Sequence, residues 1–178
     1  MRPRWLIVPS MTKQDPIFEA RRQWVAHGWG DAADGMAMVT SIMRAQQILM
    51  ERIGAELRPL GLTFARFEVL RLLAFARSNR MRMTRLGSLL QVHPTSVTSA
   101  VERLVRQGYV ERQRLDKDRR VVLAAITPSG RRIVEEATER LNAKVFGAPG
   151  LPDVQVGELT DLLTRLRACG EAVTPAGE

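Results

Sequence analysis

Apolar side chains recur at helical spacing along most of the chain, and one short stretch alternates instead. A period near 3.6 residues predicts a helix wherever it persists between capping residues, glycine and proline. The helices expected in this way cover 15–27, a long stretch from Asp31 or Asp34 to about Arg58, 63–75, 83–90, 95–107, 127–145 and 153–172. Alternation over 109–126 predicts a β-hairpin with its turn at 115–120. The pattern therefore predicts a mainly α protein with one small β-hairpin.

Local residues indicate where several of these helices begin and end. Asp15 is placed to cap the first helix, with Pro16 in its first turn, because a carboxylate accepts hydrogen bonds from free helical N–H groups. Pro59 cannot continue the second helix. The charged segment 77–80 is expected to be a connection without regular structure, and 147–152, rich in glycine and proline, a break before the last helix.

Two of the expected helices, 83–90 and 95–107, are separated by only the four residues 91–94. Two short helices joined by such a tight turn are typical of a helix–turn–helix. The apolar positions of the second helix, which we expect to face the core, are Val97, Val101, Leu104 and Val105. Its other side presents hydroxyl and basic residues: Thr95, Ser96, Thr98, Ser99, Arg103 and Arg106.

Small hydroxyl residues at the start of a helix favour an approach to DNA. They let the backbone come close to a duplex, their hydroxyls bond to phosphates or base edges, and the helix N-terminus attracts an anion. The same residues are also common as solvated surface and as N-caps. The helix alone leaves these two interpretations open.

The positive charge of the chain is concentrated around this pair of helices. The segment 62–126 holds 13 Lys and Arg against 5 Asp and Glu, so it accounts for the whole net charge of +8. The basic residues of the hairpin are Arg112, Arg114, Lys117, Arg119 and Arg120. A projecting basic loop can enter the negative minor groove beside a reading helix, and we expect Asp118 to brace a neighbouring arginine. The alternative is a solvated charged turn.

The chain offers little catalytic or metal-binding chemistry. It has two histidines and one cysteine, Cys169, at no spacing typical of a zinc site, and it has no phosphate loop, nucleophile elbow or dinucleotide fingerprint. We therefore expect no catalytic residue, no metal, no cofactor and no enzyme activity. The absence of an apolar run near the roughly 20 residues of a membrane helix, and a lone cysteine, favour a cytoplasmic protein with no membrane partner.

Two consecutive motifs resemble one family. The first, HPTSVTSAVERLVRQGYVER, covers 93–112, and the second, DKDRRVVLAAITPSG, covers 116–130. They match a recognition helix that ends in Leu-x-x-x-Gly, a wing with an Asp-x-Arg element at 118–120, and a closing Ile-Thr-x-x-Gly at 126–130. From about Asp34 to Ala172 the chain resembles the MarR family of winged helix–turn–helix regulators.

The resemblance implies a homodimer joined by helices from both ends of the chain. It implies dimerisation helices at 15–60 and 128–173 and a winged helix–turn–helix lobe at 61–127. The residues before them, 1–14, are expected to form a flexible arm, because their short apolar run is too short for a signal peptide. The expected function is a sequence-specific transcriptional regulator, a repressor on a palindromic operator in double-stranded DNA, with Arg120 as the wing arginine. The positive charge alone would also fit the alternative, a nonspecific or architectural DNA-binding protein.

The resemblance also implies a small aromatic or anionic effector bound between the two lobes. The helix at 15–27 resembles that of the branch that senses urate, which pairs a Trp in this helix with an acid in the DNA-reading lobe. Trp24 and Glu68 are the candidates for this ligand pocket, although Glu68 stands where that branch has Asp. A Trp in an amphipathic helix is more often a core residue, and this is the alternative for Trp24.

Overall fold

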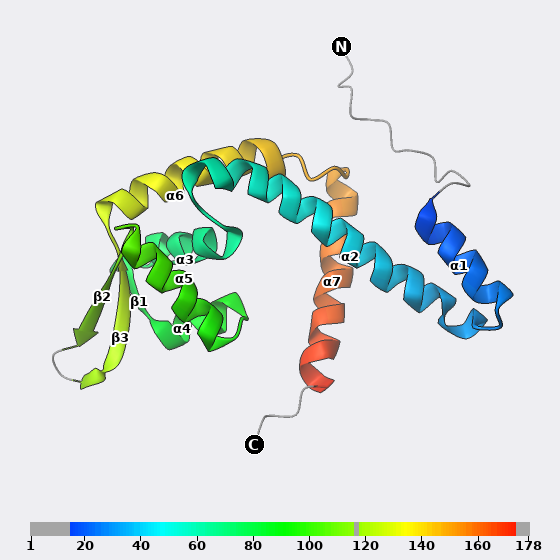
Figure 1. Cartoon of the computed structure of the whole chain (residues 1–178), viewed down its shortest axis with the longest axis horizontal. Helices are drawn as coiled ribbons and strands as arrows, with labels where there is room; N and C mark the ends of the chain where they lie inside the picture. The colour runs from blue at the N-terminus through cyan, green and yellow to red at the C-terminus, as the bar shows by residue number, and fades with distance from the viewer. Residues whose placement is uncertain (1–14, 116–117, 174–178) are drawn as a thin grey trace, which may run out of the picture.

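Helices make up most of the protein, and one of them spans much of its length (Figure 1). The computed structural model describes residues 15–115 and 118–173, with side chains described throughout except at 94, 114–115, 118–120 and 170–173. The expected fold class, mainly α with a small β-hairpin, is confirmed. The elements are α1 Pro16–Ala26, α2 Gly30–Leu57, the 3-10 helix η1 Arg58–Leu60, α3 Phe64–Phe75, β1 Arg80–Arg82, α4 Met83–Leu90, α5 Pro94–Arg106, β2 Val110–Leu115, β3 Asp118–Ile126, α6 Pro128–Leu141, the π-helical η2 Asn142–Phe146 and α7 Asp153–Val173. The expected arm at 1–14 lies outside the described residues.

The start of the long helix differs from the expectation. Asp15 does cap α1, since its Oδ1 accepts a hydrogen bond from the Ile17 N–H at 2.9 Å. In contrast, α2 begins at Gly30 without a side-chain cap, so the expectation that Asp31 or Asp34 starts it is wrong. Asp31 lies in the first turn, where a carboxylate favours the positive end of the helix. The carboxylate of Asp34 pairs with Arg21 of α1 instead.

The wing is a three-stranded antiparallel sheet with the order β1-β3-β2. On β3, Ala124 pairs with Met81 of β1 on one side and with Arg112 of β2 on the other. The expectation that 77–80 is only a connection is wrong at Arg80, which opens β1; three residues are too few to show an alternating pattern, and pairing with β3 makes them a strand. The strands also extend into the expected turn, to Leu115 and from Asp118.

The helix–turn–helix pair α4 and α5 packs on α3 through the expected apolar positions. Leu86, Val97, Val101 and Leu104 are at most 2% exposed. Val105 is 37% exposed, so its expected place in the core is wrong. At about 100° per residue, Val105 lies roughly 80° around the helix from Val97, at the edge of the apolar stripe.

One continuous core holds the helix–turn–helix lobe to the end of α2 and to α6. Its central residues come from α2, α3 and α6: Ile53, Leu57, Val69, Leu70, Leu73, Val134, Ala137 and Leu141. A second link lies at the start of α6, where the Thr127 hydroxyl donates to Gly108 O at 2.8 Å and accepts from the Gly130 N–H at 3.0 Å. The turn after α5 is thereby fixed to the first turn of α6.

Large apolar side chains remain exposed on the two helices that reach beyond this core, α2 and α7. They are Met38, Val39, Met43, Ile48, Leu49 and Met50 of α2 and Val154, Leu159, Leu162 and Leu166 of α7. Cys169, also on α7, is exposed. Within the described part of the chain, no helix is long and apolar enough to cross a membrane.

Candidate nucleic-acid interface

The outward face of α5 is formed by the residues expected from the sequence. Thr95, Ser96, Thr98, Ser99 and Arg103 are all exposed, while the opposite side of the helix is buried. At its start, His93 Nδ1 accepts from the Thr95 N–H at 3.3 Å, so the N-cap lies beside the hydroxyl residues. Short hydroxyl side chains at four of the five positions 95–99 leave the backbone of this end accessible to a flat or grooved anionic partner.

A groove of about 570 Å³ lies between the start of α3 and this face of α5. Three arginines line it, Arg66, Arg103 and Arg106, together with Thr63, Thr95, Ser96 and Ser99. Burial lowers the pKa of the Arg66 guanidinium, and the nearby charge of Arg103 lowers it further. The groove thus concentrates positive charge that an anion would relieve.

Arg66 was missed by the sequence analysis, and so was the residue that holds it. The Arg66 Nη1 donates to Gln107 Oε1 at 3.1 Å, and the Gln107 amide donates to Gly61 O at 3.0 Å. These bonds fix the end of α5 to the turn before α3. The residues are 41 and 46 positions apart along the chain, so no local pattern could have indicated the contact.

The wing extends from the same lobe beside α5 (Figure 1). Arg112 of β2 pairs with Glu102 of α5 at 3.4 Å, so part of its charge is used within the lobe. Arg114 lies on β2, and Asp118, Arg119 and Arg120 lie on β3. Their side chains, and Lys117 altogether, lie outside the described residues, as does the expected brace by Asp118.

Trp24 and Glu68 lie in different parts of one chain. The Trp24 ring contacts the ring of Trp29 edge-on, with centroids 5.1 Å apart, next to the turn between α1 and α2. Glu68 lies half-buried on α3, and burial raises the pKa of its carboxyl. Figure 1 shows α1 at the end of α2 remote from α3, so a single chain does not bring the two residues together.

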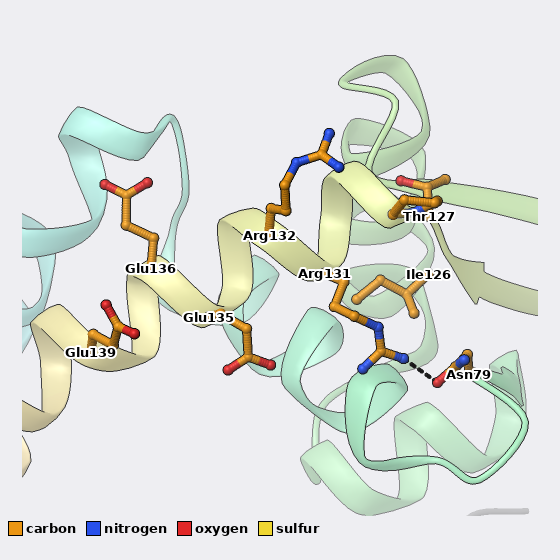
Figure 2. Close-up of a pocket in the computed structure, with 9 residues that line it drawn as sticks. Asn79, Ile126, Thr127, Arg131, Arg132, Glu135, Glu136 and Glu139 are labelled. Atoms are coloured by element: carbon orange, nitrogen blue, oxygen red, sulfur yellow. Dashed lines mark hydrogen bonds between the residues drawn. The ribbon is translucent and has the colours of Figure 1, made fainter.

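A cavity of about 700 Å³ at the start of α6 was not expected from the sequence (Figure 2). Its charged lining is mixed, with Arg131 and Arg132 near the start of α6 and Glu135, Glu136 and Glu139 further along the same helix. Arg131 donates to Asn79 Oδ1, which connects α6 to the loop before β1. Within the described residues, no group of three or more His, Cys, Asp or Glu side chains is arranged to hold a metal ion.

A helix–turn–helix followed by a β-hairpin, here β2 and β3 with β1 paired to β3, defines a winged helix–turn–helix protein. A model of the MarR family matches residues 62–122. The chain is 44% identical to Sco5413, a MarR family transcriptional regulator from Streptomyces coelicolor, over 80% of this chain and 99% of that one, with a TM-score of 0.70. The protein therefore belongs to the MarR family of transcriptional regulators.

Two further solved structures share the fold. A mutant MarR from E. coli, complexed with operator DNA, is 26% identical over 76% of this chain and 96% of that one, with a TM-score of 0.68. CouR from Rhodococcus jostii RHA1, bound to p-coumaroyl-CoA, is 24% identical over 79% and 95%, with a TM-score of 0.63, a likeness of fold alone. No curated protein matches the chain.

Proposed function

We propose that the protein is a sequence-specific DNA-binding repressor that acts as a homodimer on a palindromic operator and is released by a small ligand. One observation supports DNA binding above all: α5 buries its apolar side and exposes hydroxyl residues and Arg103 on the other. The groove lined by Arg66, Arg103 and Arg106 borders this face. The complex of E. coli MarR with operator DNA supports the same proposal.

In the proposed complex, α5 enters the major groove. Ser96 and Thr98 contact base edges, because their hydroxyls both donate and accept hydrogen bonds. Thr95, Ser99 and Arg103 contact phosphates or base edges beside them. The arginines displace condensed cations from the DNA, which makes the affinity depend steeply on salt.

The wing completes the proposed interface. Arg120 enters the adjacent minor groove, where the negative potential favours a guanidinium, and Arg114, Lys117 and Arg119 contact the backbone. Asp118 orients a neighbouring arginine through a carboxylate–guanidinium pair. These roles are assigned on the match of 116–130 to the family's wing motif.

The proposed dimer covers the exposed apolar residues of α2 and α7. A stripe of large apolar side chains on two helices is an unusual surface for a monomer in water, and a second copy of the same chain buries it symmetrically. Two-fold symmetry then sets the two α5 helices about 34 Å apart, one turn of DNA.

The proposed effector is a small aromatic or anionic molecule that contacts Trp24 and Glu68. Since one chain keeps these residues apart, this part of the proposal requires that the two subunits together form the pocket. Binding there shifts the two lobes relative to each other, and the pair of α5 helices no longer matches the operator.

Fluorescence anisotropy, which measures DNA affinity, tests the proposed role of α5. The probe is a duplex with the inverted repeat found upstream of the gene, and a scrambled duplex of equal length is the comparison. We expect Ser96→Ala and Thr98→Ala each to weaken binding to the inverted repeat by about tenfold, as loss of about 1–2 kcal/mol of base readout predicts, with less effect on scrambled DNA. Ser129→Ala, which removes a hydroxyl from α6, is the control and leaves both affinities unchanged. Equal wild-type affinity for the two duplexes would favour the alternative, a nonspecific or architectural DNA-binding protein.

Sedimentation tests the dimer separately. Leu163 of α7 is half-buried and adjoins the exposed Leu159, Leu162 and Leu166. Leu163→Glu places a charge among these leucines, so we expect the variant to sediment as a monomer at concentrations where the wild type is a dimer. Val105→Glu introduces the same change at an exposed apolar position of α5 and leaves the dimer intact. A Leu163→Glu variant that remains dimeric contradicts the proposed role of α7.

A further inference from the structure

A second basic cavity lies on the winged lobe, apart from the outward face of α5. It occupies about 660 Å³ between the C-terminal end of α3, the loop after it, β1 and α4. It shares no residue with the groove between α3 and α5, and neither Trp24 nor Glu68 lines it. Neither the DNA-binding face nor the expected effector pocket therefore explains it.

Apolar side chains form the interior of this cavity. Leu72, Met81 and Leu123 line it from α3, β1 and β3. Phe75 and Leu89 line it as well, yet they are 72% and 50% exposed. A benzyl group and an isobutyl group left in contact with water on one concave surface are stabilised by any apolar group that covers them.

Four arginines surround the apolar residues: Arg77, Arg80, Arg82 and Arg85. Of the residues that the structure describes, no acidic side chain lines the cavity. Within the described residues, the guanidinium groups of Arg77, Arg82 and Arg85 make no hydrogen bond or ion pair, and Arg80 donates only to Gln113 Oε1, at 3.4 Å. The cavity thus combines apolar contact area with cations whose hydrogen-bonding capacity is almost unused.

This combination distinguishes between classes of ligand. DNA phosphates would use the arginines but leave Phe75 and Leu89 in water. A neutral lipid-like molecule would cover these side chains but leave the arginines without partners. A volume of about 660 Å³ lies within the range of roughly 300–1,000 Å³ that small-molecule sites occupy, whereas a protein partner more often uses a broad surface.

We propose that this cavity binds a small organic anion whose apolar body is an alkyl chain or an aromatic ring and whose charge is a carboxylate. The apolar body covers Phe75 and Leu89. The carboxylate accepts hydrogen bonds from the arginines of the rim, with Arg77 and Arg80 nearest in sequence to the end of α3. Because Arg82 also lines a neighbouring cavity together with Thr98, the bound anion lies next to the DNA-binding face without being part of it.

Isothermal titration calorimetry of the full chain tests the proposal with two probes, decanoate and 4-phenylbutanoate, and with their uncharged alcohols. We expect at least one acid to bind and its alcohol to bind at least about tenfold more weakly, because the alcohol cannot form the charged hydrogen bonds. The double variant Arg77→Gln/Arg80→Gln should bind the acid about tenfold more weakly than the wild type does. Leu89→Gln should weaken the acid and the alcohol together.

A matched control removes two positive charges elsewhere, from α6, with Arg132→Gln/Arg140→Gln. If the control weakens the acid as much as the double variant in the cavity does, the effect is one of net charge and the proposal fails. It fails as well if acid and alcohol bind equally, or if neither acid binds at millimolar concentration. Binding of an acidic leucine-containing peptide in preference to both acids would assign the cavity to a protein partner and also overturn the proposal.

Discussion

Arg71 connects α3 of the winged lobe to α6. Its replacement by methionine tests how much this connection contributes to stability. From α3, its Nη2 donates to Val134 O at 3.0 Å and to Thr138 Oγ1 at 2.7 Å, and the guanidinium pairs with Glu135 at 3.1 Å. The side chain is only 15% exposed, and its Cζ lies 5.1 Å from the centre of the Phe75 ring. Methionine keeps the length and apolar stem of the side chain but removes every one of these hydrogen bonds.

The expected loss follows from these contacts. The two bonds to neutral acceptors contribute about 1 kcal/mol each, and the pair with the half-exposed Glu135 contributes about 0.5–1 kcal/mol. Among the described residues, the buried Nε of Arg71 has no hydrogen-bond partner, and removing it recovers about 1 kcal/mol of desolvation cost. We therefore expect Arg71→Met to lower the free energy of unfolding by about 2 kcal/mol.

Urea unfolding followed by circular dichroism, at one fixed protein concentration, measures this loss. A double-mutant cycle with Glu135→Gln isolates the ion pair, with an expected coupling energy of about 0.5–1 kcal/mol. An Arg71→Met variant as stable as the wild type would refute the reasoning, since it would mean that desolvation of the guanidinium cancels its bonds. A zero coupling energy would refute the contribution assigned to Glu135 alone.

Three further predictions concern packing, capping and pH. Gly130→Ala places a Cβ 2.1 Å from Tyr109 O, so we expect a loss of about 3 kcal/mol in urea unfolding, whereas Gly87→Ala, whose Cβ meets nothing nearer than 3.8 Å, should be neutral or stabilising. Thr127→Val removes both the cap on the Gly130 N–H and the bond to Gly108 O, with an expected loss of about 1–2 kcal/mol in the same assay; an unchanged midpoint would contradict the role of this hydroxyl. Burial raises the pKa of Glu68, so the folded protein binds this proton more tightly than the unfolded chain, and stability falls as pH rises through that pKa. Thermal melts should therefore show Glu68→Gln to be more stable than the wild type at pH 7, with the advantage shrinking toward about pH 4; a constant difference would show that burial of the charge is not the cause.

The elements that the sequence predicted well are those with local signals at their ends. Asp15, Thr63 and Thr127 each accept a hydrogen bond from a first-turn N–H, as their residue types predict. The outward face of α5 was equally predictable, because helical periodicity separates its hydroxyl residues from the buried Val97 and Val101; only Val105, at the edge of the apolar stripe, was assigned wrongly. These features depend on interactions within three or four residues of the chain.

The features that the sequence could not predict depend on contacts between distant residues. The strand β1 exists only through its pairing with β3, and the bond between Arg66 and Gln107 joins residues 41 positions apart. The cavity surrounded by Arg77, Arg80, Arg82 and Arg85 likewise requires α3, β1 and α4 to be folded together. Periodicity places apolar residues in helices, but only the packed structure leaves Phe75 and Leu89 exposed.

The 28-residue helix α2 has a mechanical consequence. At about 1.5 Å per residue it is about 40 Å long, and its Leu57 end is embedded in the core of the winged lobe while α1 lies at its other end. By simple lever geometry, a tilt of about 5° at the embedded end displaces the far end by about 3.5 Å. A tilt this small leaves the side-chain packing around Leu57 intact. At the turn between α1 and α2, near Trp29, the same tilt moves the backbone by about the width of an atom.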